Sequence, residues 1–390
     1  MEDAGRSAGE HLGRHRTPSR RLVNVFLGGD VMTGRGVDQI LPHPSNPRLH
    51  EYVVHDARHY LSLAEEANGP IPRRVAAQYI WGDAFEELAR EAPDVRILNL
   101  ETSITCSEAY WPDKDVHYRM HPKNIGCLTA AHIDVCALAN NHVMDWGVPG
   151  LSDTVAALRE AGIQSAGAGS NAAEARRPAL VELPSGGRVI VIALASDTSG
   201  VPPEWCASDD MPGVELVADL STRTADRVGE RIGKIKRRGD LAIVSIHWGS
   251  NWGYEVPREF VRFAHRLVAS GVDLVHGHSS HHVRPIEVER GHLILYGCGD
   301  LIDDYEGIGG YEEFRGDLVL MFFARLDATS GELAGLRMVP MQIRKMRLNR
   351  PGREDVRWLA GRVALISSPF GCSVEVASDG SAALHWRGET

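Results

Sequence analysis

Side chains that bind metal ions or move protons follow short apolar runs at several places in the sequence. The clearest case is the run Val135–Ala139, because Asn140, Asn141 and His142 come after it. Four other runs of β-type composition end in the same way, at Asp30, Glu101, His247 and His278. In open α/β sheets, binding groups gather beyond the carboxyl ends of the strands, so these side chains are expected to converge. The combination of carboxylate, amide and imidazole groups predicts a metal centre.

Two histidine–aspartate pairs predict proton transfer beside this centre. Asp145 lies three residues after His142, and a carboxylate near an imidazole fixes its tautomer and raises its basicity. Asp300 follows an expected strand whose end should lie near the loop of His281, so these two residues form a second candidate pair. The alternative for the second pair is that His281 binds the metal and Asp300 caps a turn.

Strands and helices alternate along most of the chain. Strands are expected near 22–29, 95–100, 133–139, 163–166, 188–194, 241–246, 272–276 and 292–297. Helices are expected near 83–92, 122–131, 151–161, 222–237 and 257–270. This alternation predicts a layered α/β fold.

The expected domain organisation is simple. Residues 1–21 are rich in Arg, Gly and Ser and are predicted to be a disordered lead-in. Residues 22–390 are predicted to form one domain, in which 316–390 completes a sheet and caps it. Two long segments, 36–82 and 102–120, directly follow Asp30 and Glu101 and are expected to be lids or substrate walls. Plain surface packing is the alternative for both segments.

Composition excludes several classes of protein. A formal charge of −10 over 390 residues argues against nucleic-acid binding, which needs a concentrated cationic face. No stretch approaches the roughly 18 to 20 apolar residues of a membrane-spanning helix, so a cytoplasmic protein without a membrane partner is expected. The six cysteines form no Cys-x-x-Cys pair and are expected to be reduced.

Two residues near the motifs are candidates for substrate binding. Arg119 offers a cation for a substrate carboxylate, although an ion pair within its loop explains it nearly as well. Trp248 could stack on an aromatic substrate, although packing is the usual role of tryptophan.

Six motifs in order along the chain resemble the capsule-synthesis, poly-γ-glutamate type branch of the calcineurin-like metallophosphoesterase superfamily. They are Gly29-Asp30-Val31-Met32, Asn99-Leu100-Glu101, Asn140-Asn141-His142 with Asp145, His247-Trp248-Gly249, Gly277-His278-Ser279-Ser280-His281 and Tyr296-Gly297-Cys298-Gly299-Asp300. The resemblance implies the calcineurin-like fold, a layered β-sandwich flanked by helices (αββα).

The sequence departs from the pattern of the superfamily's phosphatases at the metal site. Met32 stands where these phosphatases have a histidine, and Glu101 stands where they have a bridging aspartate. A thioether is a poor ligand for a hard divalent ion, so one ion is expected instead of two. The resemblance implies Asp30, Glu101, Asn141, His247 and His278 as its ligands in some combination, with Ca favoured and Mn or Mg as alternatives. No organic cofactor is expected.

Three functions fit these features, and the first is cofactor-independent epimerisation of a peptide. Inverting an α-carbon needs one group to remove the proton and another to return it to the opposite face, as two His/Asp pairs beside a metal allow. Within the family the chain resembles lasso-peptide epimerases, which implies an isomerase acting on the C-terminal Trp of a ribosomal precursor peptide. The alternatives are metal-dependent hydrolysis of a phosphoester or amide, and a role in capsule or poly-γ-glutamate biosynthesis. The oligomeric state is not predicted.

Overall fold

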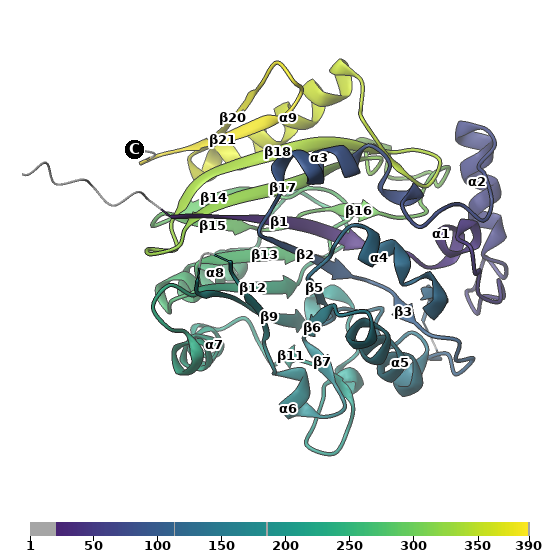
Figure 1. The fold of residues 1–390 in the computed structure, drawn as a ribbon, viewed down its shortest axis with the longest axis horizontal. Helices are drawn as coiled ribbons and strands as arrows, with labels where there is room; N and C mark the ends of the chain where they lie inside the picture. The colour runs from purple at the N-terminus through teal and green to yellow at the C-terminus, as the bar shows by residue number, and fades with distance from the viewer. Residues whose placement is uncertain (1–20, 113, 185, 389–390) are drawn as a thin grey trace, which may run out of the picture.

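The computed structural model describes residues 21–112, 114–184 and 186–388. The lead-in expected at 1–21 lies outside the described residues, apart from residue 21. The described strands and helices form a mixed α/β fold with several sheets, which confirms the α/β prediction (Figure 1).

The larger of two main sheets contains most of the N- and C-terminal strands. Its order is β20 (Cys372–Val376), β21 (Ala382–Trp386), β18 (Leu333–Ile343), β17 (Leu318–Asp327), β1 (Leu22–Val31), β2 (Val95–Leu100), β5 (Val135–Ala137) and β6 (Gln164–Ala166), with β16 (Asp300–Ile302) beside β1 and β19 (Leu348–Asn349) beside β18. Strands β1, β2, β5 and β6 run parallel to one another. Their carboxyl ends therefore lie at one edge of the sheet.

The second main sheet is built from the middle of the chain. Its order is β11 (Leu216–Val217), β9 (Arg188–Ser196), β12 (Leu241–His247), β13 (Leu274–His278), β15 (His292–Leu295) and β14 (Ile286–Glu289), with β8 (Ala179–Glu182) beside β9. Strands β9, β12, β13 and β15 are parallel.

Both faces of the second sheet are buried, which explains the nearly continuous apolar runs of its strands. In β12, Ile243 belongs to the core shared with the larger sheet, whereas Val244 belongs to a core formed with α7 (Thr222–Ile235) and α8 (Arg258–Ala269). The alternation follows from the period-2 geometry of a strand. A hydrogen bond of 3.0 Å between His276 Nε2 and the Gly28 carbonyl joins β13 to β1. The two sheets are therefore in direct contact.

The remaining helices lie around the sheets (Figure 1). They are α1 (Arg35–Ile40), α2 (Arg58–Asn68), α3 (Ala84–Glu91), α4 (Gly126–Ala130), α5 (Gly147–Glu160), α6 (Ala172–Ala175) and α9 (Arg353–Ser367). The segment 36–82, expected only as a long insertion, contains most of α1 and all of α2, and Leu61 and Ala64 of α2 are buried. The segment 102–120 contains a small sheet of β3 (Ser103–Ile104) and β4 (Arg119–Met120).

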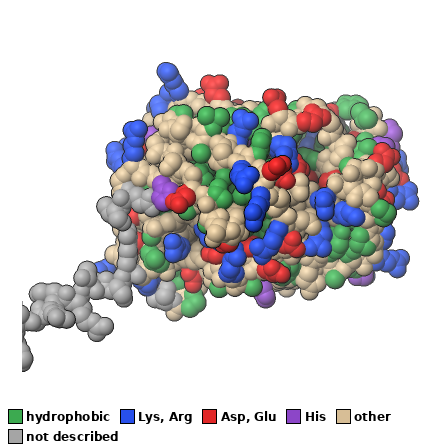
Figure 2. Space-filling view, turned by 90° about the horizontal axis from the view of Figure 1, so that it is seen from above, with side chains coloured by type: hydrophobic (Ala, Val, Ile, Leu, Met, Phe, Trp, Pro, Cys, Tyr) green, Lys and Arg blue, Asp and Glu red, His purple; other side chains and the backbone are tan. Residues whose placement is uncertain are grey.

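The outer surface carries both signs of charge. Figure 2 shows the face over α9 and the C-terminal strands, on which Lys and Arg lie intermingled with Asp and Glu. Within the described residues, no helix is both long enough and apolar enough to cross a membrane.

Candidate metal centre and acid–base site

The candidate site lies where the carboxyl ends of strands from both sheets meet. His247 and His278 are the last residues of β12 and β13 and are direct cross-strand partners. Asp30, near the end of β1, is paired with Asp300 at the start of β16. Gly29 allows this pairing, because a side chain there would lie 1.8 Å from the Gly299 carbonyl oxygen. Strand register therefore brings together residues that are far apart in sequence.

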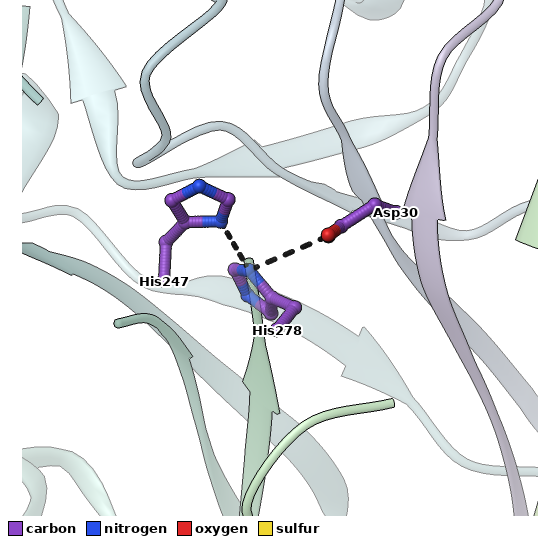
Figure 3. Close-up of side chains that lie close together, drawn as sticks. All are labelled: Asp30, His247 and His278. Carbon is purple, nitrogen blue, oxygen red and sulfur yellow. Dashed lines mark hydrogen bonds and ion pairs between the residues drawn. The ribbon is translucent and has the colours of Figure 1, made fainter. Parts of the chain in front are cut away.

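Asp30, His247 and His278 form a compact buried group (Figure 3). One potential ligand atom from each lies within 4.8 Å of the other two, and their side chains are at most 1% exposed. The Nδ1 atoms of the two histidines are 2.8 Å apart, and Asp30 Oδ1 is 3.9 Å from His278 Nδ1. Burial lowers the pKa of both histidines well below the ordinary value, which keeps them neutral and able to bind a cation.

The carboxylate of Asp30 is held by hydrogen bonds from both sides. Asn99 Nδ2 donates to Oδ1 at 2.8 Å, and the Ser279 backbone N–H donates to Oδ2 at 3.1 Å. Ser279 has φ of 100°, a conformation that is costly for a residue with a side chain and is common at functional sites. Burial, followed by repulsion from Asp300, raises the pKa of Asp30 to about 7.

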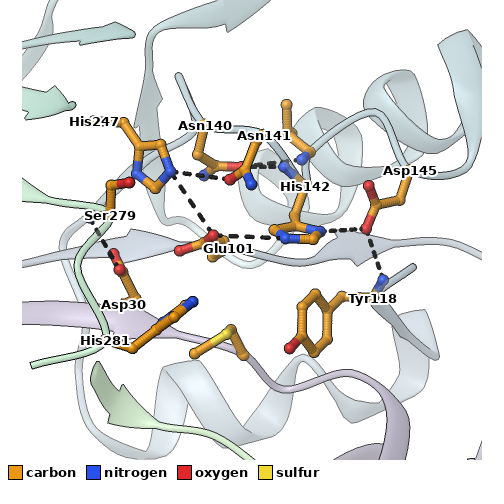
Figure 4. A network of polar contacts seen from close by, with 12 residues as sticks. Asp30, Glu101, Tyr118, Asn140, Asn141, His142, Asp145, His247, Ser279 and His281 are labelled. Atoms are coloured by element: carbon orange, nitrogen blue, oxygen red, sulfur yellow. Dashed lines mark hydrogen bonds and ion pairs between the residues drawn. The ribbon is translucent and has the colours of Figure 1, made fainter. Parts of the chain in front are cut away.

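Glu101 and Asn141 extend this group towards His142 (Figure 4). Glu101 Oε1 is 3.7 Å from both His247 Nε2 and His142 Nε2, and Asn141 Oδ1 is 2.9 Å from His247 Nε2. Burial raises the pKa of Glu101 well above its ordinary value, and the charge of Asp30 raises it further. Two buried carboxyl groups beside neutral imidazoles and an amide oxygen match the donor set of a divalent cation, so the residues fit the expected ion.

His142 and Asp145 form the first predicted pair. His142 Nδ1 is 2.7 Å from Asp145 Oδ2, which also accepts the Tyr118 backbone N–H at 2.6 Å. Lys114, which the sequence analysis did not single out, places its ammonium 2.5 Å from Asp145 Oδ1. Burial lowers the pKa of His142 to about 4, and the charge of Lys114 acts in the same direction. At neutral pH the ring is therefore neutral, with Nε2 facing Glu101.

His281 and Asp300 form the second predicted pair. Their Nδ1 and Oδ1 atoms are 2.9 Å apart, and both side chains are buried. These two residues also form a second group of potential metal ligands with Asp30. The geometry thus accommodates both roles considered for His281, proton transfer and metal binding.

The two predicted substrate-binding residues lie elsewhere. Arg119 is 5% exposed, and its guanidinium bonds to Glu108 and to the carbonyls of Ser107 and Asn46 and lies 3.7 Å from the centre of the Trp146 ring. The fully buried Trp248 ring packs in the core beneath α8, and its Nε1 donates to the Tyr296 carbonyl. The structure therefore does not bring either side chain to the cluster, and a substrate role for them stays a prediction.

Three side chains at the site, one lysine and two tyrosines, belong to no sequence motif that would predict their role. Lys114, Tyr118 and Tyr305 all lie in or beside loops, and their positions depend on tertiary contacts. The nearest sequence signal is the aromatic and charged content of 102–120, which predicted only a wall or lid.

Comparison with known proteins assigns the chain to a family. The family model described as "Bacterial capsule synthesis protein PGA_cap" matches residues 24–305, a range that contains every residue of the cluster. The chain belongs to this family. Its PGA_cap membership confirms the capsule-synthesis branch that the motifs predicted, whereas the relatives give no support to lasso-peptide epimerase specificity.

Named relatives align with most of the chain. A "Probable polyglutamine synthesis accessory protein" of Mycobacterium tuberculosis is 52% identical over 359 residues, covering 92% of this chain and 94% of that protein. The "PGA biosynthesis protein CapA" of Bacillus subtilis is 24% identical, covering 80% of this chain and 71% of that protein. A crystal structure of TT1561 of Thermus thermophilus covers 80% of this chain and 97% of its own, with 9% identity and a TM-score of 0.36.

Proposed function

We propose that this protein is a metal-dependent hydrolase that cleaves an amide or phosphoester bond during synthesis of a polyglutamate-type polymer. The observation that carries the proposal is the buried cluster in which both sheets supply ligands, beside the His142–Asp145 pair. The names of the M. tuberculosis and B. subtilis relatives support the polymer context. We also propose that the two contacting sheets correspond to the calcineurin-like layered sandwich.

The residues that would hold the ion come from separate strands. They would be drawn, in some combination, from Asp30, Glu101, Asn141, His247 and His278. A divalent ion there would supply Lewis-acid polarisation of the carbonyl or phosphoryl group.

His142 would transfer the proton. Since Asp145 accepts from Nδ1, the lone pair of His142 lies on Nε2, at the side of the ring that faces Glu101. A neutral imidazole there takes the proton of the attacking water as the oxygen–carbon or oxygen–phosphorus bond forms. The same nitrogen then returns the proton to the leaving nitrogen or oxygen.

The test combines metal analysis with hydrolysis. The purified protein is analysed for bound metals and assayed on bis-p-nitrophenyl phosphate and on γ-glutamyl oligomers, with and without chelator. We expect chelator-sensitive cleavage of one substrate class and its loss in His142→Gln. His59→Gln, at an exposed histidine, is the matched control. Cleavage that persists in His142→Gln, or no cleavage of either class, would overturn the proposal.

Peptide epimerisation is a second candidate because the two His/Asp pairs lie on different sides of Asp30 and Glu101. His142 faces Glu101, whereas His281 lies beside Asp30 (Figure 4). Two bases on either side of a bound α-carbon are what inversion requires. Deuterium uptake from D2O at the α-carbon of a C-terminal Trp peptide, with D-Trp formed, would favour this candidate over hydrolysis. Absence of deuterium uptake by the peptide would exclude epimerisation.

A further inference from the structure

Two tyrosines connect the predicted acid–base histidines. The Tyr118 ring stands edge-on to His142 with centroids 4.6 Å apart, and the Tyr305 ring stands edge-on to His281 at 5.1 Å. The tyrosine hydroxyls are joined by a hydrogen bond of 2.9 Å, which Tyr118 donates to Tyr305. The pair therefore spans the distance between the two histidines.

Among the residues that the structure describes, the proton of the Tyr305 hydroxyl has only a weak acceptor. Its neighbour is the thioether sulfur of Met32, at 3.6 Å. Sulfur of this kind accepts hydrogen bonds poorly, whereas carbonyl and phosphoryl oxygens accept them well. A substrate oxygen would therefore displace Met32 as the partner of this hydroxyl.

Tyr305 also adjoins open space. It lines a cavity of about 510 Å³ together with His281, Trp252 and Tyr311. Burial raises the pKa of the Tyr305 hydroxyl well above its ordinary value, and the charges of Asp300 and Glu101 act in the same direction. The hydroxyl thus keeps its proton and can act as a donor at the boundary between the cluster and the cavity.

Arg35 fixes the positions of both tyrosines from behind. Its buried guanidinium binds Asp304, the neighbour of Tyr305, at 2.5 and 3.1 Å, and lies 4.5 Å from the centre of the Tyr118 ring. Arg35 has φ of 45°, which costs energy for a residue with a side chain. The paired charge of Asp304 therefore anchors the guanidinium against both rings.

We propose that the Tyr305 hydroxyl is a further catalytic group, which donates a hydrogen bond to the substrate oxygen on which negative charge develops. Tyr118, by donating to Tyr305, and Arg35 are positioning residues. The substrate class is any acyl or phosphoryl compound that presents such an oxygen beside His281. The inference rests on the proposed function only in requiring that substrates bind in this cluster.

Binding of inorganic phosphate, a tetrahedral oxyanion, tests the assignment without relying on turnover. Titration calorimetry on metal-loaded wild type, Tyr305→Phe and Tyr118→Phe compares affinities, and Tyr311→Phe is the control because it removes a hydroxyl from the same cavity. We expect Tyr305→Phe to bind phosphate about 10- to 100-fold more weakly, as for loss of one hydrogen bond to a charged group. Tyr118→Phe should have a smaller effect and Tyr311→Phe none.

Metal content and thermal melting establish that each variant is folded and loaded. If Tyr305→Phe does not fold, Met32→Gln offers the Tyr305 hydroxyl a stronger acceptor and should also weaken phosphate binding. Equal affinity in wild type and Tyr305→Phe, or no phosphate binding by wild type, would overturn the role of Tyr305. Hydrolysis that depends on metal and His142 would survive that result, so the two proposals fail separately.

Discussion

The Nδ1 atoms of His247 and His278 face each other at 2.8 Å across two adjacent parallel strands. Only one of these nitrogens can donate to the other, and protonation of both rings would place two like charges in contact. Burial keeps both rings neutral by lowering their pKa values. The two neutral imidazoles would together offer nitrogen ligands to a divalent ion, and this is the physical basis for the proposed metal site.

Removal of a proposed metal ligand should strongly weaken metal binding. We expect His278→Ala to lower affinity for a divalent ion by more than about 100-fold, beyond the 10- to 100-fold cost of losing an outer partner. Metal analysis after dialysis measures the effect. His59→Ala is the control, because His59 is exposed and lies outside the cluster. Equal metal content in His278→Ala and wild type would contradict the assignment.

His281→Ala should distinguish the two roles of that residue. If His281 transfers protons, the variant keeps the full metal content of the wild type while its activity falls about 10²- to 10⁴-fold. We expect this result, with one equivalent of metal in both proteins. Loss of bound metal in the variant would instead place His281 among the ligands, in the second group with Asp30 and Asp300.

Asp145→Asn should separate tautomer control from metal binding. The side chain keeps its shape, but the amide no longer favours a proton on His142 Nδ1. We expect kcat for hydrolysis to fall about 10²- to 10⁴-fold with metal content unchanged, since a misplaced proton disables the base. Initial rates on the substrate that the wild type cleaves provide the measurement. A rate within threefold of wild type, roughly the scatter of single-site effects, would show that Asp145 has no such role.

Acid should weaken the contribution of His276 to stability. Burial lowers the pKa of this histidine from 6.5 to about 4, so the unfolded chain binds a proton that the folded protein excludes between these values. The contribution of this group to the free energy of unfolding is therefore fully present above pH 6.5 and falls as the pH drops towards 4. The free energies of unfolding of wild type and His276→Gln, measured with denaturant in the presence of chelator, should approach each other by at most about 3 kcal/mol as the pH falls through this range. A constant difference would contradict the shift.

The sequence predicted the strand ends well because their chemistry is local. Asp30, His247 and His278 each close an apolar run, and parallel strands in both sheets then align them. Helix α2 was missed because its segment 36–82 was read as a loop, although Leu61 and Ala64 bury one face of it. The prediction that these strand residues lie together needed only the rule that binding groups gather at the carboxyl ends of strands.

The residues that the sequence did not single out, and the predicted residues that lie away from the cluster, owe their positions to long-range packing. Tyr305 reaches Tyr118 across 187 positions of sequence, and no local pattern encodes that contact. Trp248 follows His247 directly, yet alternation along an extended chain turns its ring to the opposite side, under α8. Adjacency in sequence was therefore a poor guide to adjacency in the site.

The proposed ligands come from two sheets that contact each other mainly through apolar side chains. Asp30 and Glu101 come from one sheet, and His247 and His278 come from the other. A bound ion would therefore cross-link the sheets, in addition to their apolar packing and the hydrogen bond between His276 and the Gly28 carbonyl. Metal supply would then govern the protein's resistance to unfolding and proteolysis as well as its chemistry.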